Sequence, residues 1–198
     1  MAFENGFDPV DDLLTAQTER PAELGQVNLR TLSPFQRALL VIDGTVTKFI
    51  EAYTMEPVEV VRLEQQERQL RGDHPWLEIP AGTTVAARQV MLRGRYSRHF
   101  WAYAQSLVVL DRVVGEVRNK LDIQGESIGR MLNARDMETR RDVLWYGRER
   151  VDELPDEVRK VCDGEFISRT YRIVTGGKPI MMITEKFPMG ADNLPSHH

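Results

Sequence analysis

The chain has 198 residues and a formal net charge of −4, with 41% hydrophobic and 28% charged residues. This is the composition of an ordinary globular protein, and the length suits one sizeable domain with its own core. The negative charge argues against nucleic acid or an anionic membrane as the main partner, although a single arginine can still bind an anionic ligand. Cys162 is the only cysteine, which excludes an intrachain disulfide and favours a reducing compartment.

The chain shows neither a targeting nor a membrane pattern. Its start, "MAFENGFDPVDDLL", has no basic region leading into an apolar stretch, so no signal peptide is predicted. The longest apolar run, "FWAYAQSLVVL", is interrupted by Gln105 and Ser106 and is too short to span a bilayer. We therefore expect a cytoplasmic protein with no membrane partner, as a monomer or a weak homo-oligomer.

Three parts are expected along the chain: an N-terminal arm over residues 1–31, a domain over residues 32–188 and a tail over residues 189–198. The domain begins with "LSPFQRALLVI", where Ser33 as N-cap and Pro34 in the first turn predict a helix. Asp43 and Gly44 separate it from a second short helix. "PVEVVRLEQQERQL" is predicted to be a strand and "HPWLEIPAGT" a loop.

The rest of the domain is rich in strands. "VAARQVMLRGR" and "HFWAYAQSLVVL" predict a hairpin, "DRVVGEVRNKLD" and "GESIGRMLN" two helices, and "ETRRDVLWYGRE" another strand. "LPDEVRKVCDG" predicts a helical segment. It is followed by the hairpin "FISRTYRIV-TGGK-PIMMITEKF", with Gly176 and Gly177 in its turn. Hairpins with a few helices indicate an α+β fold with an antiparallel sheet.

Familiar catalytic motifs are absent from the sequence. It contains no HExxH, CxxC, G-x-S-x-G or glycine-rich phosphate loop, and no pair of histidines at metal-ligand spacing. No metal site and no cofactor are therefore predicted. The arginine-rich segment "RGRYSRH" is interpreted as a solvated hairpin tip rather than a nucleic-acid contact.

Two charged residues stand on apolar strand faces. Arg88 shares its face with Ala86, Val90 and Leu92, and Glu185 lies between Ile183 and Phe187. A buried charge is costly unless it is paired or hydrogen-bonded.

One interpretation is structural, with Arg88 and Glu185 paired to each other or to neighbours. The other is a ligand site, because an arginine fork suits a carboxylate and a partly desolvated glutamate suits proton transfer or a hydroxyl. The second interpretation predicts a small molecule with a carboxylate at one end and a hydroxyl or ether at the other.

The C-terminal hairpin "YRIVTGGKPIMMITEKFP" resembles a motif of the chorismate pyruvate-lyases (4-hydroxybenzoate synthases), in particular their archaeal and actinobacterial branch. "LLVIDGTVTKFIEAY", "AARQVML" and "ESIGRML" are similar to shorter segments of the same family, so the resemblance runs from about Leu32 to Pro188. It implies a single antiparallel sheet of about six strands, with helices forming flaps over a buried ligand pocket. It also implies conversion of chorismate to 4-hydroxybenzoate and pyruvate without a cofactor.

The resemblance implies roles for individual residues as well. Glu185 and Arg88 would be the catalytic residues, with Arg88 on the ring carboxylate and Glu185 at the opposite end of the ring. The backbone N–H groups of Val46 and Ile128 would also bind that carboxylate. Gln105 falls near a position where the ubiquinone-pathway branch has an arginine, so substrate access there is expected to differ.

Three alternatives stay open at this point. The first is a non-catalytic module that senses an aromatic carboxylate, since the same fold serves as the effector-binding domain of GntR-type regulators. The second is a lyase acting on a chorismate analogue. The third is that both charged residues are structural and only the fold is shared.

Overall fold

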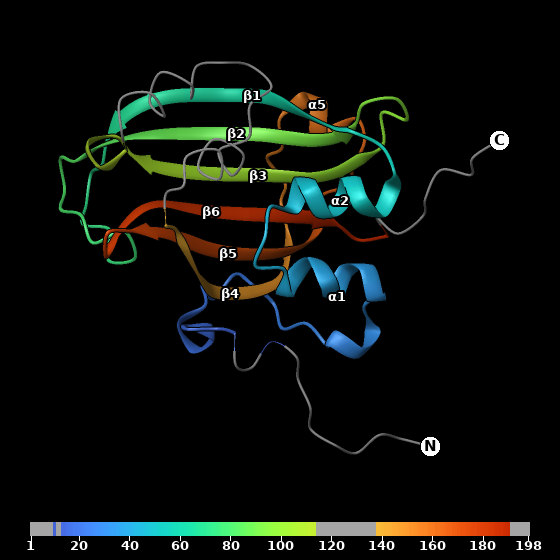
Figure 1. Cartoon of the computed structure of the whole chain (residues 1–198), viewed down its shortest axis with the longest axis horizontal. Helices are drawn as coiled ribbons and strands as arrows, with labels where there is room; N and C mark the ends of the chain where they lie inside the picture. Colours follow the sequence, from blue (N-terminus) through green and yellow to red (C-terminus); the bar gives the residue numbers. More distant parts are fainter. Residues whose placement is uncertain (1–9, 11–12, 114–137, 191–198) are drawn as a thin grey trace.

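The computed structural model describes residue 10, residues 13–113 and residues 138–190. Its centre is one six-stranded sheet in the order β1-β2-β3-β6-β5-β4, in which all neighbouring strands are antiparallel (Figure 1). The strands are β1 (Val58–Gln69), β2 (Thr84–Gly94), β3 (Phe100–Val109), β4 (Arg140–Arg150), β5 (Glu165–Thr175) and β6 (Lys178–Pro188). The predicted α+β class with a single antiparallel sheet of about six strands is confirmed.

The sheet consists of two three-stranded meanders that meet at β3 and β6. Ala104 lies opposite Glu185 across this junction, and Ser106 lies opposite Ile183. On the other side of β3, Ser106 lies opposite Arg88. The strands that carry Arg88 and Glu185 are therefore separated by β3 alone.

The turn between β5 and β6 is formed by the two glycines that the sequence predicts for it. Gly176 has φ 55° and Gly177 has φ 76°. A two-residue turn with positive φ at both positions matches the right-handed twist of a hairpin and strongly favours glycine. The pair Thr175–Lys178 flanks the turn directly.

The register of this hairpin shifts once along its length. Counting back from the turn would place Glu185 opposite Ser168, but an irregularity at Ile173/Val174 moves the pairing by one residue. Glu185 consequently lies opposite Arg169, so that both side chains extend from the same face of the sheet.

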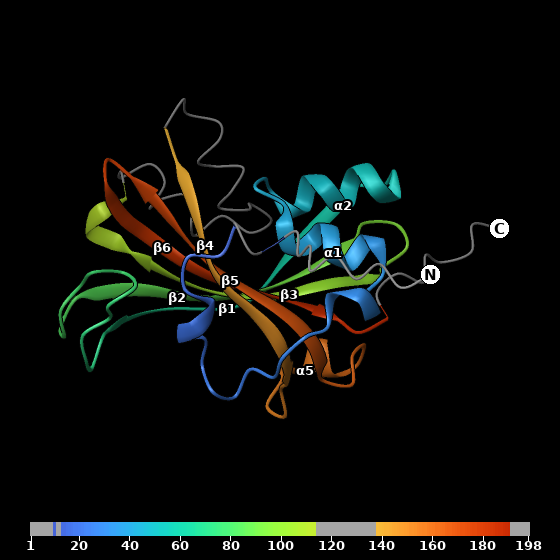
Figure 2. The ribbon, with the colours of Figure 1, turned by 90° about the horizontal axis from the view of Figure 1, so that it is seen from below.

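Two helices, α1 (Pro34–Val41) and α2 (Val46–Thr54), cover one face of the sheet, and the single-turn α5 (Asp156–Arg159) lies on the other (Figure 2). The predicted start of α1 is confirmed as a capping box. The Ser33 hydroxyl accepts from the Gln36 backbone N–H, and the Gln36 side chain accepts from the Ser33 N–H. Phe35 and Leu39 of α1 pack with Ile50 of α2 in the core above the sheet.

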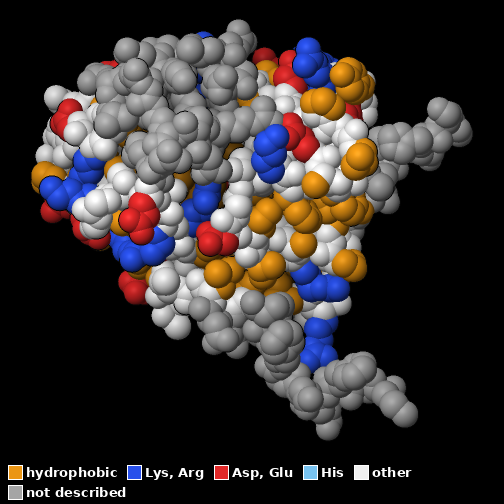
Figure 3. Space-filling view, in the orientation of Figure 1, with side chains coloured by type: hydrophobic (Ala, Val, Ile, Leu, Met, Phe, Trp, Pro, Cys, Tyr) orange, Lys and Arg blue, Asp and Glu red, His pale blue; other side chains and the backbone are white. Residues whose placement is uncertain are grey.

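Hydrophobic side chains also gather on the outer surface of the α1–α2 layer (Figure 3). Tyr53 and Met55, at the end of α2, are 41% and 89% exposed. The opposite face of the sheet has apolar clusters of its own; one of them packs Val158 of α5 against Phe166 and Tyr103.

The N-terminal segment runs along the outer edge of β4 and contains two short 3-10 turns, η1 (Gln17–Glu19) and η2 (Leu29–Thr31). Leu14 bridges Val143, and Gly25 bridges Arg148. Covering an edge strand in this way removes a site where another chain could pair. Residues 13–31 thus pack on the domain, while the division into residues 1–31, 32–188 and 189–198 stays a prediction.

After β3 the chain enters η3 (Leu110–Arg112). The remainder of the two helices predicted after β3 lies outside the described residues, as does Ile128. Among the helices that the structure describes, none is both long and apolar enough to cross a membrane.

Candidate active site

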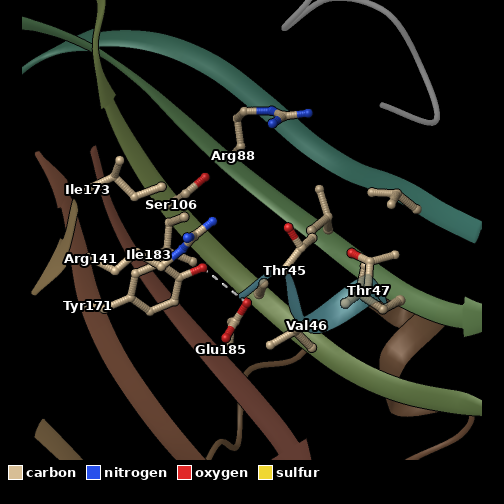
Figure 4. Close-up of a pocket in the computed structure, with 14 residues that line it drawn as sticks. Thr45, Val46, Thr47, Arg88, Ser106, Arg141, Tyr171, Ile173, Ile183 and Glu185 are labelled. Carbon is tan, nitrogen blue, oxygen red and sulfur yellow. Dashed lines mark hydrogen bonds between the residues drawn. The ribbon is translucent and has the colours of Figure 1, made fainter. Parts of the chain in front are cut away.

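A pocket lies between the sheet and the connection that joins α1 to α2 (Figure 4). Its walls come from α2 and its N-cap and from all six strands. They comprise Thr45, Val46, Thr47, Val60, Arg88, Val90, Leu92, Ala104, Ser106, Arg141, Tyr171, Ile173, Ile183 and Glu185. Three of the four residues proposed from the sequence, Arg88, Val46 and Glu185, thus line one pocket.

Arg88 is buried on the apolar face of β2, as the strand periodicity predicts, and is only 4% exposed. Its Nε donates to Oε1 of Gln65, its cross-strand neighbour on β1, at 2.8 Å. This bond orients the guanidinium at the pocket wall. Such an arginine is suited to an anionic ligand.

The N-terminus of α2 opens into the same pocket. Thr45, the N-cap, makes no capping bond with its side chain, and its carbonyl accepts from the N–H groups of Lys48 and Phe49. The N–H groups of Val46 and Thr47 precede these in the helix and have no intrahelical acceptor. Helix N-termini with such N–H groups favour anions. The position implied for Val46 therefore has a physical basis.

Glu185 is 7% exposed and accepts two hydrogen bonds. Arg169 Nε donates to its Oε2 at 2.9 Å, and the Tyr171 hydroxyl donates to its Oε1 at 3.2 Å. The possibility that Glu185 pairs with Arg88 is therefore wrong, because the carboxylate is paired with its cross-strand neighbour on β5. The broader structural interpretation, pairing with a neighbouring arginine, is what the structure shows, but Glu185 also lines the pocket.

Arg169 also connects Glu185 to the layer of helices. Its Nη1 donates to the carbonyl oxygens of Ile42 at 2.8 Å and Leu40 at 3.4 Å, at the end of α1. Its Nη2 is buried and has no hydrogen-bond partner among the described residues. One guanidinium thus holds both the carboxylate and the chain segment above it.

Tyr171 stays protonated at physiological pH. Burial and the charge of Glu185 raise the pKa of its hydroxyl, and the charges of Arg169 and Arg141 only partly oppose this rise. The hydroxyl is therefore a donor to Glu185. With a guanidinium and a phenol both donating to it, the Glu185 carboxylate is arranged as a hydrogen-bond acceptor.

Arg141 on β4 is a pocket residue that the sequence did not single out. It lies opposite Ile173, and its Nη1 contacts the carbonyl oxygen of Asp43 at 3.3 Å. Its Nε is buried and has no partner among the described residues. On β4 the arginine follows another arginine, Arg140, so strand alternation allowed either of the two to face inward.

Gln105 lies on the other face of the sheet. It is exposed and lines a polar hollow there with Thr184 and Gln89. The expected effect of Gln105 on substrate access therefore stays a prediction without a contact to the pocket. Within the described ranges, no group of three or more His, Cys, Asp or Glu side chains is placed to hold a metal ion.

The family described as "Chorismate pyruvate-lyase Rv2949c-like" matches residues 40–194. The chain belongs to this family. It is 26% identical over 173 residues to the "Chorismate pyruvate-lyase" of Mycobacterium tuberculosis, with 83% of this chain and 84% of that protein covered. The "Chorismate pyruvate-lyase" of Mycobacterium leprae is 26% identical over 170 residues, covering 83% of this chain and 79% of that one. The resemblance seen in the sequence is confirmed.

Solved structures of other proteins share the fold. PhnF from Mycobacterium smegmatis superimposes with a TM-score of 0.59 at 10% identity, over 75% of this chain and 65% of that one. A GntR-family regulator from Bacillus cereus gives a TM-score of 0.52 at 12% identity, over 71% of this chain and 98% of that one. At such identities only the fold is shared.

Proposed function

We propose that this protein is a chorismate pyruvate-lyase, which converts chorismate to 4-hydroxybenzoate and pyruvate without a cofactor. One observation supports this beyond the family: Arg88 and the Glu185–Tyr171 pair lie on opposite sides of one pocket. With one strand between β2 and β6 and a two-residue offset, the Cα atoms of Arg88 and Glu185 are about 12 Å apart by ideal sheet spacing. Because both side chains rise from the same face of the sheet, a six-membered ring with a polar group at each end spans a distance of this order.

The ring carboxylate would bind at Arg88 and at the N-terminus of α2. There the backbone N–H of Val46 has no intrahelical acceptor and could donate to the carboxylate. The far edge of the ring would then face Glu185. That edge of chorismate carries the enolpyruvyl ether and, on the next carbon, a hydroxyl and a hydrogen. The walls between the two ends include Val90, Ala104 and Ile183, which suit the apolar ring.

The reaction is an elimination that restores aromaticity. The bond between the ring carbon and the ether oxygen breaks, and its electron pair leaves on the enolpyruvate oxygen. Glu185 takes the proton from the neighbouring ring carbon, and that C–H electron pair becomes the last double bond of the aromatic ring. Enolpyruvate gains a proton at its terminal carbon to give pyruvate. The protein then has to position the substrate and accept one proton, which are tasks for side chains alone.

The second candidate is a binding module for an aromatic carboxylate, which the fold shared with regulators favours. Such a module needs Arg88 and the α2 N-terminus. It does not need a buried carboxylate held as an acceptor by Arg169 and Tyr171.

The deciding experiment is incubation of the purified protein with chorismate, following 4-hydroxybenzoate and pyruvate together. Equal amounts of both products, formed also in the presence of a chelator, are expected. Tight binding of 4-hydroxybenzoate without any turnover of chorismate would support the sensing module instead. A requirement for added metal, or a 3-hydroxybenzoate product, would contradict the proposed mechanism.

A further inference from the structure

We propose that Arg141 binds the carboxylate of the enolpyruvyl group, the carboxylate that departs in pyruvate. The pocket would then recognise its substrate through two carboxylates, one at Arg88 and one at Arg141. This inference rests on the proposed lyase function and concerns a residue for which the sequence predicted no role.

The position of Arg141 follows from strand register. It lies opposite Ile173 on β5, and Ile173 lies opposite Met181 on β6, so these side chains share the face that carries Tyr171. Figure 4 shows its guanidinium reaching toward the middle of the pocket, beside the Tyr171 hydroxyl. Burial raises the pKa of the Tyr171 hydroxyl, and the charge of Arg141 acts in the opposite direction.

The bonding of Arg141 is incomplete, in contrast to that of neighbouring arginines. Arg140 and Arg172 both donate to the carboxylate of Asp142, at 2.7 and 3.0 Å. Arg141 forms no ion pair with a carboxylate of the described residues, and its buried Nε has no partner there. Its hydrogen bond to the Asp43 carbonyl oxygen is 3.3 Å long. A buried donor without an acceptor is costly, so an acceptor supplied by a ligand explains why it is tolerated.

The two arginines stand at opposite ends of the pocket. In the strand order, β2 and β4 are four spacings apart, which places the Cα atoms of Arg88 and Arg141 on the order of 19 Å from each other. In that order Glu185 on β6 lies between them, but along the strands Glu185 and Arg141 are displaced from Arg88 in opposite directions, by two residues each. The Arg141 side chain covers this offset, since its guanidinium lies beside the Tyr171 hydroxyl that donates to Glu185 (Figure 4). A ring whose carboxylate is held at Arg88 has its far edge near Glu185 and Tyr171, and a substituent next to that edge can reach Arg141.

This arrangement separates substrate from product. Chorismate carries a carboxylate at each end, whereas 4-hydroxybenzoate retains only the one at Arg88. Once the ether bond is cleaved, the carboxylate at Arg141 belongs to pyruvate, whereas the carboxylate at Arg88 belongs to 4-hydroxybenzoate. Arg141 therefore contributes to the binding of chorismate and not to that of the aromatic product.

The test compares Arg141→Met with Arg140→Met. Both changes remove one positive charge from β4 and keep a long side chain, but Arg140 is 72% exposed and faces away from the pocket. For Arg141→Met we expect the KM for chorismate to rise tenfold or more, while the dissociation constant of 4-hydroxybenzoate changes less than about twofold. Arg140→Met should change neither value, and Arg141→Lys should recover part of the lost affinity.

Two results would overturn the inference. An unchanged KM in Arg141→Met would show that the second carboxylate binds elsewhere. Equal losses of affinity for chorismate and 4-hydroxybenzoate would show that Arg141 only supports the pocket through Asp43.

A second measurement separates this test from that of the lyase function. Calorimetry measures the affinity for chorismate of two proteins, Glu185→Gln alone and Glu185→Gln combined with Arg141→Met. If the natural protein fails to turn chorismate over, the lyase proposal is wrong. The same pair of titrations still decides whether Arg141 binds a second carboxylate.

Discussion

Consecutive residues on β6 carry two buried ion pairs, one on each face of the sheet. Glu185 pairs with Arg169 on the α1–α2 side, where the two side chains are 9% and 1% exposed. Lys186 pairs with Glu149 on the opposite side, where the side chains are 7% and 14% exposed. By sequence and by burial alone, the two pairs are equivalent.

Their surroundings differ. The carboxylate of Glu149 accepts from the Ser168 hydroxyl in addition to Lys186, and neither charged side chain lines the pocket beneath α1 and α2. Glu185 faces that pocket, and its partner Arg169 keeps a buried Nη2 without a partner in the described part of the chain. Burial of an ion pair therefore does not by itself separate the two faces. The role proposed for Glu185 rests on the pocket that its side chain lines.

The largest expected effect tests the pocket side of this comparison. Glu185→Gln should lower turnover of chorismate by about 10²–10⁴-fold, because an amide cannot accept the ring proton. Binding of 4-hydroxybenzoate should persist, since the site proposed for its carboxylate is at Arg88, at the other end of the pocket. Rates, product affinity and melting temperature are measured together, with the rates taken well below the melting transition. A folded Glu185→Gln protein with wild-type turnover would remove Glu185 from the chemistry.

The matched change on the opposite face is Lys186→Met. It leaves the carboxylate of Glu149 buried without its cation, which should lower the free energy of unfolding by about 3–5 kcal/mol. Turnover per folded molecule should stay near that of the natural protein. Adding Glu149→Gln should recover much of the stability, as judged by denaturant unfolding. If Lys186→Met lowered turnover as much as Glu185→Gln does, the two faces would not be functionally distinct.

Arg88→Ala sharpens the comparison at the carboxylate end of the pocket. Hydrogen bonds to charged groups contribute about 1.5–3 kcal/mol, so affinity for 4-hydroxybenzoate should fall tenfold or more. Phenol, which lacks the carboxylate, should bind the variant about as well as the natural protein. Arg93→Ala, on the same strand but paired with Glu59 at its edge, serves as the control. Equal losses for 4-hydroxybenzoate and phenol would assign Arg88 a structural role.

The smallest expected effect concerns Asp142, which lies on the face away from the pocket. Burial opposes its ionisation, but the hydrogen bonds and charges of Arg140 and Arg172 outweigh it and hold the pKa of Asp142 below its ordinary value. A carboxylate with a lowered folded pKa stabilises the fold above its unfolded pKa of about 3.9, and the contribution is lost as the pH falls through the folded value.

Asp142→Asn should therefore cost about 1–3 kcal/mol at pH 7, and the difference from the natural protein should shrink below about pH 4. Urea unfolding at several pH values measures this directly. A difference that stays constant down to pH 3 would show that the ionised form of Asp142 contributes no stability.

Much of the fold was predictable because its determinants are local. Ser33 and Pro34 mark the start of α1, and the glycine pair marks the β5–β6 turn. Strand alternation placed Arg88 and Glu185 on inward faces because each stands in an apolar series with a period of two. Val46 came from the family resemblance, and the structure adds that it begins α2.

The partners of these residues were not predictable in the same way. Arg169 is opposite Glu185 only because of the shift at Ile173/Val174, and a simple count from the turn pairs Glu185 with Ser168. Arg141 enters the pocket from a strand that pairs with β5 across a long connection. Such contacts depend on tertiary register, which a single sequence does not encode locally.

The Gly176–Gly177 turn also limits how this gene can change in length. Insertions and deletions are usually tolerated at exposed hairpin tips, but here the turn, with the shift at Ile173/Val174, fixes which residue of β6 meets Arg169. A gain or loss of one residue between the two strands would turn the Glu185 side chain to the opposite face and present a neighbouring side chain to the pocket. Lineages that keep the activity should therefore keep the number of residues between Arg169 and Glu185, even where the residues of the turn itself vary.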